Sequence, residues 1–508
     1  MKWLKYLGML LVVVTIVFVI LANRDMTRIY GGLTERVDRS SFSSVEGPIT
    51  FTNVNVLSPD GERFVPNQSV RVNEGLIVSI QNSATLSSSE QITGTHIDAT
   101  GKYLIPGLTD THVHLWKSPN DLLLYVANGV TQIRELIGEE DHLQWRKDIQ
   151  RGHLGPDMFI ASPRIGSFGG VEGFFMEWSQ GFMNINGADE ADKEVRKLHR
   201  QGYDAVKIYS HISRETYFAV VKTAKELNMR IIGHVPFALG LDDVYTDQES
   251  IAHLEELMNA LNREFGGFKS ATAEDFLTFV RKRSDDVAQK LRDNDMAVST
   301  TLWLVESFVK QKFDLDGVLS SVELEYENPG ISEWTPRVPE GGLGWLPGVN
   351  RYARSGYLTQ EEAEARRTFW VTYAEACRII LRSLVKEGVM IMTGTDANLP
   401  PTVPGFSLHD EFTSLVKAGM STSEVLNAAT AQPANWLNNN AGYLEPGKRA
   451  NMVLLEANPL EDIGNTRAID SVVLNGKLLE RKVLDAMLLA VKGANDSSRQ
   501  QDIGRFVK

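Results

Sequence analysis

The chain has 508 residues, 43% of them hydrophobic and 23% charged, which is typical of a globular protein with one large domain and a smaller one. The net charge of -13 and the lack of a long Lys/Arg run exclude a nucleic-acid partner, because such a surface would repel phosphates. The only cysteine is Cys377, which excludes a disulfide framework and a thiolate zinc cluster. We therefore expect a small-molecule or peptide substrate, and any metal must be held by His, Asp, Glu or a modified Lys.

Residues 1–25 have the composition of a membrane anchor or signal segment. Lys2 and Lys5 precede an uncharged stretch from Tyr6 to Asn23 that is rich in Leu, Val and Ile. Its end, from Val19 to Ala22, lacks the small residue that signal peptidase prefers at the minus-three position, which favours an uncleaved anchor over a secreted form. With the basic end in the cytoplasm, we expect an extracytoplasmic catalytic domain, periplasmic in a bacterium, that meets the membrane through this segment only.

Both ends of the remaining chain predict antiparallel sheet. Short β-branched runs, separated by turns such as Ser-Pro-Asp-Gly and Asn-Glu-Gly, cover residues 49–56, 68–72, 76–80, 452–456 and 471–478. We expect residues 45–103 and 443–485 to meet in one small β-sandwich domain.

Between these ends, short apolar runs alternate with helical segments, which indicates repeated βα units and a parallel sheet. The expected strands are Tyr103 to Thr109, Thr131 to Leu136, Met158 to Ser162, Ala205 to Tyr209, Arg230 to His234, Ser250 to His253, Ala297 to Leu302 and Met390 to Thr395. Eight such strands predict an α/β fold, a (β/α)8 TIM barrel over residues 104–442, with its chemistry at the C-terminal ends of the strands.

Two connections are long enough to be functional loops. Residues 166–189 follow the third strand and carry five aromatic residues, and residues 305–370 follow the seventh strand and include Tyr326, Trp334 and Trp345. Each segment is expected to be a lid or binding loop, and a homo-oligomer contact is the alternative for the second. Cys377 lies in a helical run from Thr372 to Lys386, which favours a buried structural thiol.

The first barrel strand ends in an H-x-H motif. Because alternate residues of a strand face the same side, His112 and His114 can point at one metal from the barrel mouth. This spacing alone is weak evidence, since such pairs also arise by chance.

Later strands end in further groups of the same kind. Lys207 lies inside an apolar strand run, where burying its charge is costly unless it is paired or removed. His234, His253 and Asp396 each close another apolar strand. Each residue alone could be a satisfied core group or a helix cap, but six polar residues at five strand ends indicate a metal site.

In this order, H-x-H, Lys, His, His and Asp on strands one, four, five, six and eight, the chain resembles the amidohydrolase superfamily, and most of all its imidazolonepropionase-like branch with dipeptidases acting on Xaa-Pro dipeptides. The resemblance covers about Ile49 to Glu480. It includes Gly129-Val130-Thr131-Gln132-Ile133-Arg134, Leu408-His409-Asp410-Glu411 and the segment Leu444-Glu445-Pro446-Gly447-Lys448.

The resemblance implies two divalent metals, with zinc the first expectation. His112, His114 and Asp396 would hold one, His234 and His253 the second, and Lys207 would bridge them as a carbamate formed with carbon dioxide. A hydroxide shared by the metals would attack the substrate carbonyl, and Asp396 would take its proton and pass it to the leaving nitrogen.

Four further residues are candidates for substrate binding. Tyr209 shares the barrel-facing side of Lys207, and Arg164, just after strand three, could receive a substrate carboxylate. His211 and His409 are the other two, since they follow strand four and strand eight.

The favoured function is hydrolysis of a C–N amide bond in a dipeptide or a cyclic amide. Both substrates stay open, because the stretch from Ser210 to Glu215 lacks the small residues that the dipeptidases of this branch tend to have there. Hydrolysis of a lactone or a phosphotriester on the same metals is one alternative. A mononuclear deaminase or imidazolonase is less favoured, because it would leave Lys207 without a role. A non-catalytic scaffold is the alternative of another class.

Overall fold

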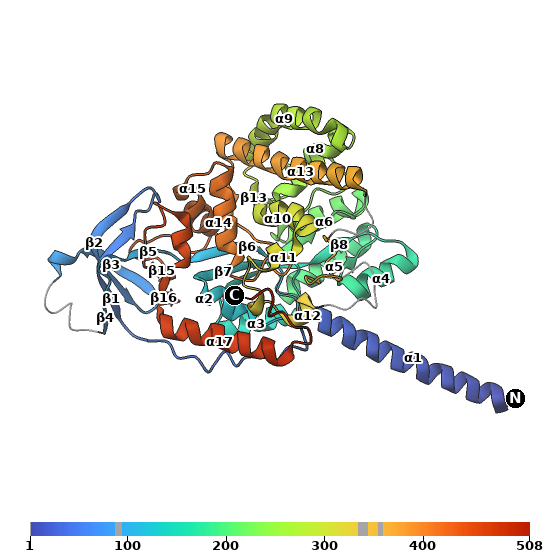
Figure 1. Ribbon diagram of the computed structural model, residues 1–508, viewed down its shortest axis with the longest axis horizontal. Coiled ribbons are helices and arrows are strands. Elements are labelled where there is room, and N and C mark those ends of the chain that lie inside the picture. Colours follow the sequence, from blue (N-terminus) through green and yellow to red (C-terminus); the bar gives the residue numbers. More distant parts are fainter. Residues whose placement is uncertain (1, 87–93, 334–343, 354–358, 508) are drawn as a thin grey trace.

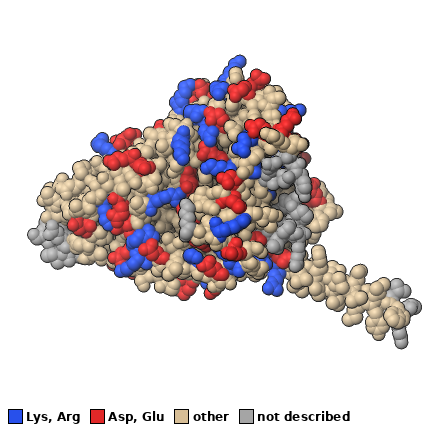
Figure 2. Space-filling model, in the orientation of Figure 1, with Lys and Arg blue, Asp and Glu red and all other residues tan. Residues whose placement is uncertain are grey.

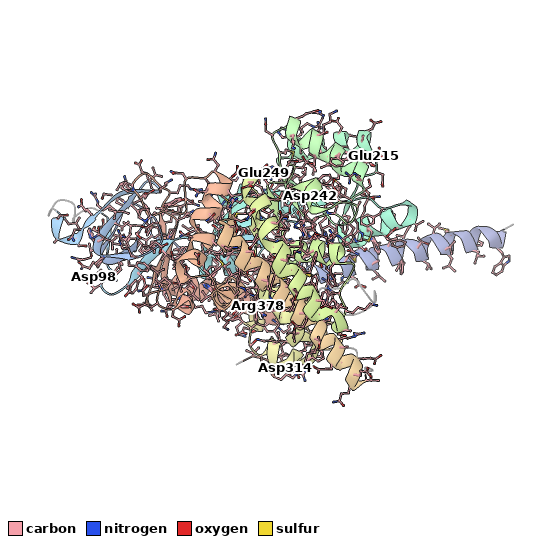
Figure 3. The ribbon with its side chains drawn as sticks, turned by 90° about the horizontal axis from the view of Figure 1, so that it is seen from above. Asp98, Glu215, Asp242, Glu249, Asp314 and Arg378 are labelled. Atoms are coloured by element: carbon pink, nitrogen blue, oxygen red, sulfur yellow. The ribbon has the colours of Figure 1, made fainter. Side chains whose placement is uncertain are left out.

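The computed structural model describes residues 2–86, 94–333, 344–353 and 359–507. A central barrel carries a β domain at one end, and the N-terminal helix α1 (Lys2–Ile29) projects from the opposite end (Figure 1). The sticks of Figure 3, seen from above, show the same projection of α1. Trp334 lies outside the described residues.

Eight parallel strands form the barrel, which confirms the predicted fold class. Their order is β6 (Leu108–Val113), β7 (Val130–Glu135), β8 (Asp157–Gly166), β10 (Ala205–Ile208), β11 (Arg230–Gly233), β12 (Ser250–Ile251), β13 (Ala297–Ser299) and β14 (Ile391–Met392). Residues beyond β14 close the ring onto β6, because the amide of Thr111 donates to Thr393 O (2.9 Å) and the amide of Asp396 donates to His112 O (2.8 Å).

The expected first strand from Tyr103 to Thr109 is in fact two strands. β5 (Tyr103–Pro106) belongs to the β domain and pairs with β15 (Met452–Leu455), whereas β6 opens the barrel. Gly107 separates them, and a side chain there would clash with Thr131. Since Leu104, Ile105 and Leu108 are all buried, the apolar run continues across the boundary and its pattern does not mark the change of sheet.

Helices surround the barrel and connect its strands. They are α2 (Asp121–Ala127), α3 (Glu140–Gln150), α5 (Ala188–Gln201), α6 (Arg214–Glu226), α7 (Leu241–Val244), α8 (Leu254–Phe265), α9 (Ala273–Asp293), α10 (Leu302–Phe313), α13 (Gln360–Glu387), α14 (Ser407–Ala418), α15 (Thr422–Ala429) and α16 (Ala431–Leu437). In α13, Thr359 and Glu362 form a capping box and Gly388 ends the helix in the left-handed conformation. Cys377 is fully buried in α13, as expected for a structural thiol.

The two long connections contain secondary structure of their own. Residues 166–189 fold into α4 (Gly170–Gln180) and β9 (Met183–Asn184), which pairs with the end of β8. Residues 305–370 include α11 (Leu315–Leu319) and α12 (Pro329–Ser332). Trp345 is fully buried and Tyr326 stacks on Phe406, so these two aromatics pack within the chain.

Strands from both chain ends form one eight-stranded sheet, the predicted β domain. The central strand β1 (Ile49–Leu57) pairs with β2 (Phe64–Asn73) on one side and with β4 (Thr95–Asp98) and then β5 on the other, so the sheet branches there. The remaining strands are β3 (Leu76–Asn82), β15, β16 (Ile469–Leu474) and β17 (Lys477–Glu480). The chain then forms α17 (Arg481–Ser498), a helix that the sequence analysis did not predict and that packs on α2.

His409 is held at the junction of the barrel and the β domain. It was expected near the barrel mouth, but it lies on α14 with its ring fully enclosed, and its Nε2 donates to Asn128 O (3.2 Å). Its Nδ1 lies 2.8 Å from Thr466 Oγ1 and, with Nε2 protonated, accepts from it. The expectation was wrong because the loop after β14 turns away before α14 begins at Ser407.

The Gly233 position on β11 has no room for a side chain. Its φ is +145°, and a Cβ there would approach Ile208 O on β10 to 2.1 Å. We expect Gly233→Ala to lower the free energy of unfolding by about 1–3 kcal/mol and to displace His234, which follows it. Gly152→Ala is the matched control, because Gly152 has φ +106° in open space. Thermal unfolding measures both, and equal losses would contradict the prediction.

The buried ring of His409 predicts acid sensitivity. Burial, and then Arg467, lower the pKa of His409 to about 3, whereas an unfolded chain binds this proton near pH 6.5. The folded state therefore keeps its full stability from this group above pH 6.5 and loses about 2 kcal/mol of it between pH 6.5 and 5. We expect the melting temperature of His409→Asn to fall less between pH 7.5 and 5.0 than that of the wild type. An exposed-site control, His153→Asn, should behave like the wild type. If the melting temperature of His409→Asn falls as much as that of the wild type, His409 is not the source of the acid sensitivity.

Candidate metal centre and active site

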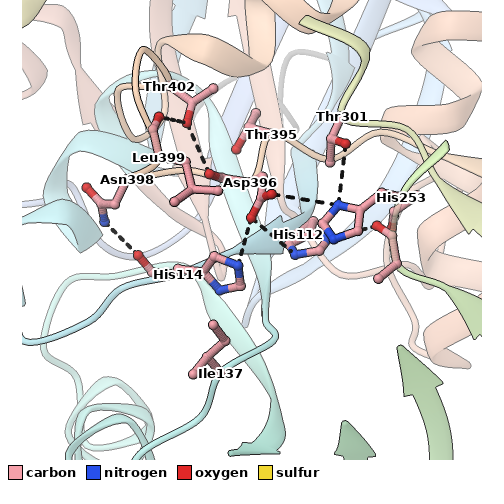
Figure 4. Close-up of polar contacts among 12 residues, drawn as sticks. His112, His114, Ile137, His253, Thr301, Thr395, Asp396, Asn398, Leu399 and Thr402 are labelled. Atoms are coloured by element: carbon pink, nitrogen blue, oxygen red, sulfur yellow. Dashed lines mark hydrogen bonds and ion pairs between the residues drawn. The ribbon is translucent and has the colours of Figure 1, made fainter. Parts of the chain in front are cut away.

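Three side chains meet where the barrel closes, as Figure 4 shows. His112 lies at the end of β6, His114 just beyond it, and Asp396 follows β14. Asp396 Oδ1 lies 2.7 Å from His114 Nε2 and 3.4 Å from His112 Nε2. Asp396 has a left-handed backbone, φ +59°, a conformation unfavourable for a non-glycine residue and often found at functional sites.

His234 and His253 complete a second group beside the first. Their Nε2 atoms lie 3.2 Å apart, and His253 Nδ1 lies 3.7 Å from Asp396 Oδ2. The ring of His253 stacks on that of His112 at 4.3 Å between centroids. Lys207, on β10 between β8 and β11, is fully buried and lines the same cavity. The structure thus brings all six sequence-predicted ligands into one site.

Several atoms of this site have no hydrogen-bond partner among the described residues. They include His112 Nε2, Lys207 Nζ and Asp396 Oδ1, all buried. Unsatisfied buried polar atoms are costly, and imidazole and carboxylate are ligands that divalent metals such as zinc accept. The donor set therefore fits a divalent metal.

The electrostatics keep every candidate ligand but His114 in a metal-binding protonation state. Burial lowers the pKa of His114, but the charges of Asp396 and Glu135 outweigh it and raise this pKa above its ordinary value. Burial lowers the pKa of His253 to about 3 and those of His112 and His234 well below their ordinary value, so these rings are neutral. Burial raises the pKa of Asp396, but the neighbouring histidines outweigh it and bring it to about 2. Burial also lowers the pKa of Lys207 to about 7, against the opposing charge of Asp396, so a neutral amine is accessible.

Three buried carboxylates behind the histidines were missed by the sequence analysis. Asp110 accepts from Thr395 Oγ1 (2.7 Å) and from the amide of His112 (3.2 Å). Glu135 accepts from the amides of Leu115 and Ile137 and lies 3.8 Å from His114 Nδ1.

Glu256 is the third of these buried carboxylates, and its Oε1 lies 3.2 Å from His234 Nδ1. Glu135 and Glu256 thus lie beside a second ring nitrogen of His114 and His234, the position from which a carboxylate orients a metal-binding histidine. Acidic residues inside or directly after apolar strand runs, as in Thr109-Asp110-Thr111, were the available sequence signal.

The histidines line a cavity of about 130 Å³ with cationic and aromatic walls. Tyr209 and Arg164, two of the four candidate substrate contacts, line it. Arg164 lies over the ring of Phe182 (4.4 Å) and its Nε has no hydrogen-bond partner in the described chain. His211 is exposed and packs instead against Phe168 and Phe237. It turns outward because β10 ends at Ile208 and residues 210–211 form a turn, so the alternation of the strand does not reach His211.

Other lining residues come from segments that sequence reasoning did not connect to the site. Tyr30 directly follows α1, Gln180 ends α4, and Arg351 belongs to the long connection before α13. Tyr30 OH donates to Ser179 O (2.8 Å), and the amide of Lys117, beyond β6, donates to Tyr30 O (2.9 Å). No local motif marks these residues, because they reach the cavity only through tertiary packing.

Comparison with known proteins agrees with this geometry. The model of the amidohydrolase family matches residues 171–479. Similar solved structures include bottromycin amidohydrolase, with 22% identity, TM-score 0.66, and coverage of 92% of this chain and 96% of that one. Another is a putative prolidase from Bifidobacterium longum, with 21% identity, TM-score 0.61, and coverage of 88% of this chain and 99% of that one.

A third, A. niger ochratoxinase, has 18% identity, TM-score 0.60, and coverage of 86% and 96%. No curated protein matches the sequence. The family match spans more than half of the chain. The barrel and the buried His-His-Asp group of this protein are consistent with a hydrolase that can hold a divalent metal. The chain belongs to the amidohydrolase family.

Proposed function

We propose that this protein hydrolyses a C–N amide bond in a small substrate and uses two divalent metals, most simply zinc, to do so. The observation that carries the proposal is a cluster of six buried ligand-type side chains at the ends of five barrel strands. Atoms from three of these strand ends, those of β6, β10 and β14, have no hydrogen-bond partner among the described residues. His112, His114 and Asp396 would hold one metal, and His234 and His253 the other. Metals bound there would activate water and polarise the substrate carbonyl.

Lys207 fits the role of a bridging ligand once it is carboxylated. It lies in the same cavity, its Nζ has no partner among the described residues, and a pKa of about 7 makes the neutral amine available to carbon dioxide. The carbamate replaces a poorly solvated buried cation by an anionic oxygen ligand. A scaffold without catalysis would have no use for such a costly buried amine.

The protein's own groups supply the proton transfer and the substrate contacts. Asp396, with a pKa of about 2, is ionised and can accept a proton from the attacking water and deliver it to the leaving nitrogen. The ring of Tyr209 is tilted against that of His234, at 4.3 Å between centroids, and borders the place for the developing oxyanion.

The substrate is an amide that bears a carboxylate. Arg164 and Arg351 both line the cavity, and guanidinium groups recognise carboxylates through paired hydrogen bonds. One similar structure is titled a prolidase complexed with N-methylphosphonate-L-proline, which supports a dipeptide as the first substrate to test, ahead of a cyclic amide.

The N-terminal helix anchors the protein in a membrane. Tyr6–Ile29 is the one helix of the described chain that is long and apolar enough to span a bilayer, and none of its apolar window is buried. In the view of Figure 2 the outer part of this rod shows no charged side chains, and the charged residues of Tyr6–Ile29 are Arg24, Asp25 and Arg28, near the body. Such exposure is unfavourable in water, and we place the catalytic domain on the side away from the cytoplasm.

Lys207→Ala tests the metal site. In the full-length protein grown with zinc and bicarbonate, elemental analysis should find near two metals per chain, and Lys207→Ala should lose at least one because the bridging ligand is gone. Short carboxylic acids should partly restore metal content by filling the vacated space. Lys225→Ala, an exposed lysine on the helix after the same strand, is the control. Full metal content in Lys207→Ala would refute the carbamate.

Asp396→Asn tests the reaction. Metal-loaded wild type should hydrolyse Xaa-Pro and related dipeptides in preference to lactones and phosphotriesters. Asp396→Asn should lower kcat by about 100-fold or more, because it removes both the proposed proton carrier and one proposed metal ligand, with little change in thermal stability. Asp410→Asn, which removes only a surface ion pair with Arg467, should keep the wild-type rate. Undiminished turnover by Asp396→Asn would remove this residue from catalysis, and preferential lactone cleavage would reject the amidase proposal.

A further inference from the structure

The outer face of helix α4 carries a cluster of exposed apolar side chains. Val171, Phe174, Phe175 and Trp178 are 72%, 64%, 52% and 38% exposed. Their spacing of i, i+3, i+4 and i+7 puts them on one side of the helix, while the buried Gly173 and the cavity-lining Gln180 face the barrel. Contiguous exposed aromatics on a soluble surface are unfavourable and mark a contact site.

This apolar face lies beside the base of the membrane anchor. Trp178 Nε1 donates to Asn23 Oδ1 (2.9 Å), and Tyr30 OH donates to the carbonyl of Ser179 on α4 (2.8 Å). Figures 1 and 3, at right angles to each other, both show α4 at the end of the body from which α1 leaves.

The length of α1 brings this end of the body to the bilayer. The continuously exposed stretch from Tyr6 to Leu21 is about 24 Å long at 1.5 Å per residue, slightly less than the hydrocarbon core of about 30 Å. A short span leaves no spacer between membrane and body. Asn23, among the first polar residues after the span, is the partner of Trp178, and tryptophan favours the headgroup level.

We propose that the apolar face of α4 inserts into the bilayer surface beside α1 and holds the Tyr30 and Gln180 wall of the catalytic cavity at the membrane. The inference rests on the anchoring proposed above. α4 contains Glu172 and Glu177 and no Lys or Arg, so the contact is apolar and suits a zwitterionic lipid surface. Four side chains of one helix offer roughly a few hundred Å² of contact, less than the about 800 Å² per partner of a stable protein interface, which favours lipid over a second copy.

Site-directed spin labelling of the full-length protein tests this insertion. The variants Phe174→Cys and Phe175→Cys are each labelled with a nitroxide and inserted into phosphatidylcholine nanodiscs that hold one protein chain per disc. Cys377 is fully buried, and the unsubstituted protein gives the labelling blank. Collision rates with oxygen, which concentrates in lipid, are compared with those of a water-soluble nickel chelate. Val78→Cys, at a 46% exposed site on β3 in the distant β domain, is the control.

We expect the oxygen-to-nickel ratio at positions 174 and 175 to exceed that at position 78 by about tenfold, as for side chains below the headgroups. If the protein enters the discs but the oxygen-to-nickel ratio at both positions is that of a side chain in water, the insertion of α4 is refuted and the proposed anchor is not. Protection that appears only in discs with two chains would assign the face to self-association and overturn it as well. Failure of the full-length protein to enter discs would overturn the anchor and this inference together.

Discussion

The fold of this protein depends on the burial of polar groups that the chain does not itself satisfy. His112, Lys207 and Asp396 present atoms to the cavity that find no hydrogen-bond partner among the described residues. Burying such groups in an apolar barrel costs several kcal/mol unless a ligand compensates them. The arrangement therefore fits a site that could hold a divalent metal.

Two of these residues, His112 and Asp396, also close the barrel. Within the described chain, no regular ladder of hydrogen bonds joins β14 to β6. Instead, the amide of Asp396 donates to His112 O, and Asp110 accepts hydrogen bonds from the amide and the hydroxyl of Thr395. The candidate metal group and the closure of the barrel consequently share the same segments of chain. The left-handed backbone of Asp396 is tolerated because contacts on both sides of the seam determine its position.

The N-terminal segment is part of the catalytic body as well as the proposed anchor. Tyr30 lines the cavity, holds Ser179 at the end of α4, and receives a hydrogen bond from Lys117 just after the first barrel strand. Residues before and after the barrel strands thus meet at the mouth. Any movement of α1 relative to the body would be felt directly at the wall of the active site.

The sequence by itself determined the barrel, the β domain from both chain ends and the six candidate ligands. Strand periodicity and the cost of burying Lys207 or a histidine are local properties, readable where each strand ends. Tertiary structure alone decided the split of the first expected strand at Gly107, the carboxylates Glu135 and Glu256 behind the histidines, and the recruitment of Tyr30 and Arg351 to the cavity. It also turned His211 and His409 away from the site, because a side chain's surroundings are set by packing between segments far apart in the chain, which local pattern does not encode.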